Sequence, residues 1–135
     1  MSIATALLRF ACIYFGTALT LLLLISQVIR PFTQFSSNMI FLVLSIGLVL
    51  SQFVRANGDF PQGRERVIFT LGVMLLDLAF IAFALTTITP KAVLARYSDS
   101  LAPLVLGIFA VHAVLILVAI VMTRKRLLES GALRG

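Results

Sequence analysis

Hydrophobic residues fall in four long runs, and the short segments between them carry most of the charged positions. The runs cover residues 10–29, 38–54, 67–88 and 101–122. A helix that crosses the ~30 Å hydrocarbon core of a bilayer needs about 20 mainly apolar residues. None of the runs alternates polar and apolar positions as the strands of a membrane barrel do. The pattern therefore predicts an all-α fold, in which residues 1–135 form a single transmembrane domain, a four-helix bundle.

Composition indicates the same class of protein. Hydrophobic residues make up 61% of the 135 positions and charged residues only 12%, with a mean hydropathy of +1.12. Soluble domains carry about 25% charged residues. A chain of this size has too much surface for its volume to hide so many apolar side chains from water. We therefore expect a multi-pass protein of the bacterial inner membrane, surrounded by membrane lipids.

The formal net charge of +6 bears on orientation. Lysines and arginines gather at the ends of the apolar runs instead of in one stripe, which indicates membrane topology and argues against nucleic-acid binding. The first and third loops hold only Arg30, Lys91 and Arg96. The N-terminal segment, the middle loop and the C-terminal tail hold the other eight: Arg9, Arg55, Arg64, Arg66, Arg124, Lys125, Arg126 and Arg134. Both termini should therefore lie in the cytoplasm.

Polar and small residues recur at seven-residue spacing within the first two runs, which places them on one face of each helix. In membranes such faces supply interhelical hydrogen bonds and close packing, and a polar conduit is the alternative. A partner protein could also use them, unless they face one another inside the bundle. The stripe consists of Gly16, Thr20 and Gln27 in the first run, and Asn38, Ser45 and Gln52 in the second.

Two ionisable residues lie at the midpoints of the last two runs, Asp77 in the third and His112 in the fourth. Helices joined by a short loop run antiparallel, so the two midpoints share one depth and the side chains can meet. A carboxylate at a helix centre costs about 2.5–3.5 kcal/mol on insertion scales, and contact with an imidazole would lower that cost. The pair serves either as a proton- or ion-binding site or as a structural contact between the helices.

The sequence offers little for catalysis. Ser45 lies near the depth of Asp77 and His112, but Leu44-Ser45-Ile46-Gly47 lacks the sharp glycine-flanked turn of a hydrolase nucleophile. Cys12 is the only cysteine, and no cluster of cysteines, histidines or carboxylates indicates a metal site. No glycine-rich loop indicates a phosphate cofactor. We therefore expect a protein that is not an enzyme and that needs no cofactor.

The middle loop carries a family resemblance. Phe53-Val54-x-x-x-Gly58-x-x-Pro61-x-x-x-Glu65-Arg66, between the second and third runs, resembles the ABZJ-type family of small bacterial four-span proteins. The resemblance covers about fourteen residues and agrees with the chain length and the span layout. It implies a helical inner-membrane protein and assigns no reaction. In physical terms Gly58 ends one helix and Pro61 begins the next.

Two classes of function fit these features. The first is a non-enzymatic binding protein, most sharply an immunity protein that neutralises a pore-forming bacterial toxin by intramembrane contact. The second is a small proton-coupled transporter, or an accessory subunit of a membrane complex. Small multidrug exporters have four spans and one embedded acid, but that acid lies in the first helix. Here it is Asp77, in the third run, which favours the binding class. The oligomeric state stays open.

Overall fold

The computed structural model describes residues 1–25, 32–87, 91, 95 and 98–133, with side chains for all of these except 21–25, 32–37, 98 and 101. The described residues form helices and no strands. Four of the helices are long and apolar enough to cross a membrane. In chain order the elements are α1 (Ile3–Ile25), α2 (Phe32–Asn57), α3 (Gly63–Thr87), the short 3-10 helix η1 (Ser98–Ser100) and α5 (Leu101–Glu129).

The helices extend beyond the apolar runs at several ends, because local polar contacts continue the helical geometry outside the apolar segment. Ser2 Oγ accepts a hydrogen bond from the Thr5 N–H at 3.2 Å, which caps α1 well before residue 10. At the C-terminal end of α2, Gly58 adopts φ +80° and donates its N–H to the Val54 carbonyl at 2.7 Å. Residues 26–29 and 88 of the expected spans lie outside the described residues.

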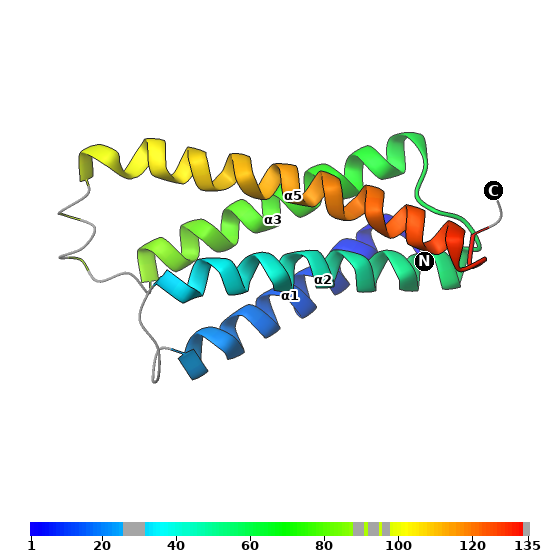
Figure 1. Ribbon diagram of the computed structural model, residues 1–135, viewed down its shortest axis with the longest axis horizontal. Helices are drawn as coiled ribbons and strands as arrows, with labels where there is room; N and C mark the ends of the chain where they lie inside the picture. The colour runs from blue at the N-terminus through cyan, green and yellow to red at the C-terminus, as the bar shows by residue number, and fades with distance from the viewer. Residues whose placement is uncertain (26–31, 88–90, 92–94, 96–97, 134–135) are drawn as a thin grey trace.

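The four long helices form one bundle in which each packs against two others (Figure 1). α1 contacts α2 and α3, and α5 contacts the same two helices, so α2 and α3 are diagonal although they follow one another in the chain. Gly72 on α3 permits one close approach, because a Cβ there would lie 2.6 Å from Leu7 Cδ2 on α1. Figure 1 shows that α1 is inclined to α2 and α5, as α3 is, and that the C-terminal end of α1 lies away from the other helices.

Both described chain ends lie at the same end of the bundle as the loop between α2 and α3 (Figure 1). Asn57 Nδ2 donates to the Met1 carbonyl at 2.8 Å, and Arg9 donates to Gln52 Oε1 at 3.1 Å, so the start of α1 is tied to the end of α2. We call this end of the bundle the basic end, since it carries most of the described lysines and arginines: Arg9, Arg55, Arg64, Arg66, Arg124, Lys125 and Arg126.

Among the described residues, the interior of the bundle is apolar apart from the buried side chains of Ser45, Asp77 and His112 and the hydroxyl group of the buried Tyr14. α2 contributes the largest share of the core, since six of its large apolar side chains are almost fully buried: Leu42, Ile46, Val49, Leu50, Phe53 and Val54. Large apolar side chains also cover the outside, as expected for a surface that faces lipid. Examples are Leu8, Leu75, Leu106 and Met122, each at least 60% exposed.

Candidate functional site

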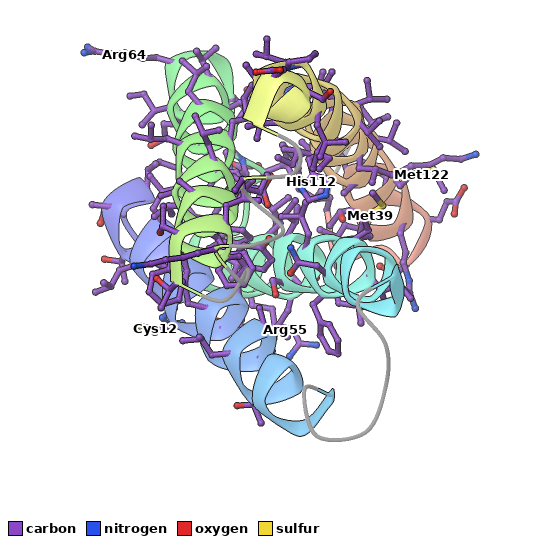
Figure 2. The ribbon with its side chains drawn as sticks, turned by 90° about the vertical axis from the view of Figure 1, so that its left-hand side faces the viewer. Cys12, Met39, Arg55, Arg64, His112 and Met122 are labelled. Atoms are coloured by element: carbon purple, nitrogen blue, oxygen red, sulfur yellow. The ribbon has the colours of Figure 1, made fainter. Side chains whose placement is uncertain are left out.

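The candidate site begins with the contact between Asp77 on α3 and His112 on α5. His112 Nδ1 lies 2.8 Å from Asp77 Oδ2, and both side chains are completely buried. Figure 2 shows His112 directed into the space between the helices. The contact expected from the matched depths of the two residues is therefore present. The contact joins two helices that run in opposite directions. Each residue lies near the middle of its own helix, so the two side chains lie at a similar depth along the bundle.

Tyr14 and Asn38 extend this pair across the whole bundle. The Tyr14 hydroxyl donates to Asp77 Oδ1 at 2.6 Å and accepts a hydrogen bond from Asn38 Nδ2 at 2.9 Å. The four side chains come from α2, α1, α3 and α5, one from each long helix. We call Asn38, Tyr14, Asp77 and His112 the polar chain. Because every link joins two different helices, the polar chain fixes the helices in one relative arrangement.

Aromatic packing holds the Tyr14 hydroxyl in place. The Tyr14 ring stacks on Phe10 from the same helix, at a centroid distance of 5.2 Å and an interplanar angle of 19°. Phe80, one turn along α3 from Asp77, also packs against the Tyr14 ring, at a centroid distance of 5.3 Å and an interplanar angle of 56°. Phe15 closes the group with edge contacts to Tyr14 and Phe80. The ring therefore has one well-packed position, and the hydroxyl is aimed at the carboxylate.

Both ends of the polar chain carry a buried atom without a hydrogen-bond partner, Asn38 Oδ1 and His112 Nε2. The Asp77–His112 pair can hold one proton without net charge, either as carboxylate with imidazolium or as neutral acid with neutral imidazole. When a neutral imidazole donates its Nδ1–H to the carboxylate, the lone pair lies on His112 Nε2, and that atom can accept a proton. The described residues include no group of three or more His, Cys, Asp or Glu side chains that could hold a metal ion.

The predicted stripe residues separate into an inward-facing group on α2 and an outward-facing group on α1. Seven-residue spacing places residues on one face of a helix, but it does not show which way that face points. On α2, Ser45 is buried and Asn38 belongs to the polar chain. Gln52 is half-buried and bound to Arg9. On α1, Gly16 and Thr20 are exposed on the outside of the bundle, so the two stripes do not face each other. Gln27 lies outside the described residues.

The residues of the middle loop lie at the basic end. Phe53 and Pro61 are buried, and Gly58 has the positive φ given above. Glu65 is exposed in the first turn of α3, where its N–H donates to the Gln62 carbonyl at 3.0 Å. These residues thus form the turn from α2 to α3 and lie apart from the polar chain.

Sequence reasoning missed Tyr14, which stands within an aromatic and aliphatic stretch of the first run and resembles its apolar neighbours there. A signal was present, since a carboxylate in the middle of one helix requires donors, and Tyr14 is the only donor-bearing aromatic residue in the first run. Comparison with protein-family models, with curated proteins and with solved structures gives no match to this chain.

Proposed function

We propose that this protein is a non-enzymatic binding protein of the bacterial inner membrane. In its most specific form, the proposal is that the chain is an immunity protein that neutralises a pore-forming toxin. One observation carries the proposal: the polar side chains divide into an inner group that ties the helices together and an outer group on α1. The inner group is the polar chain with Ser45. The outer group is Cys12, Gly16 and Thr20, one turn apart and exposed.

The outer group suits contact with another transmembrane helix. Nothing lies within 4 Å of a Cβ placed on Gly16, so a foreign helix can approach the α1 backbone there. The Thr20 hydroxyl donates to the Gly16 carbonyl at 2.7 Å, which leaves its lone pairs for a donor from a partner. Helix association in lipid depends on such small residues and hydrogen bonds because apolar burial yields little there. The inclination of α1 away from its neighbours also favours access to this helix.

The orientation follows the distribution of basic residues. Lys and Arg are retained on the cytoplasmic side of inner-membrane proteins. The basic end of the bundle, which includes both described chain ends, is then cytoplasmic. A toxin that inserts apolar helices from the outer side would meet α1 within the bilayer.

A protection assay tests the proposal. Cells expressing the chain are challenged with a panel of pore-forming bacterial toxins, and loss of membrane potential is measured. Wild type should preserve the potential, and Gly16→Leu should remove protection at equal expression. Gly107→Leu is the matched control, since Gly107 lies on α5, is also exposed, and also has nothing within 4 Å of an added Cβ. Equal protection by the Gly16 and control variants would contradict a binding face on α1.

Proton-coupled transport is a second candidate, and the Asp77–His112 pair with its unpartnered Nε2 atom is the observation that favours it. Embedded acids of transporters bind the coupling proton near the bilayer midplane. Purified protein in liposomes distinguishes the candidates. Substrate-linked proton movement that is lost on Asp77→Asn would establish transport and overturn the immunity proposal. On the immunity proposal, Asp77→Asn alters protection only as far as it lowers stability.

A further inference from the structure

A pocket of about 320 Å³ lies at the basic end, between the loop that joins α2 to α3 and the last turns of α5. Phe60, Leu128 and Leu133 form apolar parts of its wall. Arg66 from α3 and Arg124 from α5 line the same pocket. Two cationic side chains from different helices therefore converge on one partly apolar recess, well away from the polar chain.

The walls of this pocket are fixed by backbone geometry. Gly131 adopts φ +73°, which turns the chain back after α5 and lets Ala132 and Leu133 donate their N–H groups to the Leu127 carbonyl at 3.1 and 3.2 Å. Leu133 is consequently only 7% exposed. On the opposite wall Phe60 is 5% exposed, held by the turn that Gly58 begins. The recess is thus part of the folded bundle.

Within the described residues, the two arginines at the pocket have no acidic partner. Neither guanidinium forms an ion pair within the described part of the chain, and Asp59, which also lines the pocket, pairs with neither of them. Both side chains are exposed. Two guanidinium groups that line one pocket without an ion-pair partner provide planar sets of donors suited to the oxygens of a phosphate.

The depth of the arginines matches that of lipid phosphates. At 1.5 Å per helical residue, Arg66 lies about 16 Å along α3 from Asp77, and Arg124 lies about 18 Å along α5 from His112. Half the thickness of the hydrocarbon core is about 15 Å. With the polar chain near the middle of a bilayer, both guanidinium groups lie just outside the core, in the headgroup layer.

We propose that this pocket binds the phosphodiester headgroup of an anionic phospholipid. Arg66 and Arg124 hold the phosphate oxygens, and the wall formed by Phe60, Leu128 and Leu133 contacts the glycerol and the first acyl carbons. The proposal goes beyond the proposed function and is independent of it, because a lipid can occupy this pocket whatever the outer face of α1 binds.

Lipid binding to the purified full chain tests the proposal. Retention of phosphatidylglycerol or phosphatidylcholine is titrated by native mass spectrometry, and melting temperature is measured in parallel. Phosphatidylglycerol should bind more tightly than phosphatidylcholine. Arg66→Gln with Arg124→Gln should weaken phosphatidylglycerol binding by roughly tenfold or more, since each charged hydrogen-bonding group contributes on that order. Arg66→Lys with Arg124→Lys keeps the charge but loses the forked donors, and should weaken binding by a smaller factor.

A control pair with the same change in net charge lies on the same helices. Arg64 projects away from the bundle (Figure 2), and Lys125 is 71% exposed beside Glu129, with Nζ and Oε1 3.8 Å apart. Arg64→Gln with Lys125→Gln should retain wild-type binding. Equal weakening in this control would show general surface attraction and overturn the pocket. Equal binding of both lipids would also overturn the proposal. An equal rise in melting temperature with inorganic phosphate alone would assign the site to small anions instead of lipids.

Discussion

Tyr14→Phe isolates the contribution of one hydroxyl group to the stability of the bundle. The substitution keeps the ring and its contacts with Phe10 and Phe80, and it removes the bonds to Asp77 and Asn38. Hydrogen bonds within membranes contribute about 0.6 kcal/mol on average and about 1.7 kcal/mol at most. We assign the upper value to the short hydrogen bond between the Tyr14 hydroxyl and Asp77, and a value near the mean to the hydrogen bond from the Asn38 side chain. The free energy of unfolding should therefore fall by about 2 kcal/mol.

A double-mutant cycle separates the two bonds. Asp77→Ala removes the acceptor of the Tyr14 hydroxyl without adding volume at this fully buried position. In that background Tyr14→Phe should cost only the bond to Asn38, about 0.6 kcal/mol, so the coupling between the two positions is about 1–2 kcal/mol. Unfolding is measured in mixed micelles as the fraction of denaturing detergent rises, with helicity as the readout. Thr86→Val is the control, since that exposed hydroxyl bonds only within its own helix. Equal costs of Tyr14→Phe in both backgrounds would refute the reasoning.

Three further predictions concern packing and topology. Asp77→Asn and His112→Ala should be non-additive by about 0.5–3 kcal/mol in the same unfolding assay, and additivity would show that their 2.8 Å contact does not couple them. Gly72→Leu should destabilise the bundle by about 1–3 kcal/mol because α1 approaches closely there, whereas Gly16→Leu should leave the unfolding free energy nearly unchanged. Reporters fused after Gly135 and in the loop between α3 and α5 should report opposite sides of the membrane, and periplasmic activity of the C-terminal fusion would contradict the orientation.

The sequence predicts the helices well, because crossing lipid requires an apolar length that few other structures need. It also predicts the contact between Asp77 and His112, since α3 and α5 are linked in the chain and both residues lie near mid-helix. The diagonal placement of α2 and α3 could not be predicted in this way, because apolar side chains face lipid and protein alike. The spacing likewise places Gly16 and Thr20 on one face of α1, and Asn38 and Ser45 on one face of α2. It does not show that the face on α1 points outward and the face on α2 points inward, because lipid and protein are equally apolar.

The order of partners around Asp77 has a consequence for how the chain enters the bilayer during synthesis. The helices emerge from the ribosome in sequence, so the carboxyl group of α3 reaches the lipid before α5 has emerged. Tyr14 on α1 is already present, and its hydroxyl can shield one oxygen of Asp77 at once. His112 arrives with the last helix and shields the other. The free-energy cost of inserting the acid is thus lowered in two steps, first by the hydrogen bond from Tyr14 and then by the contact with His112 when α5 packs against the other helices.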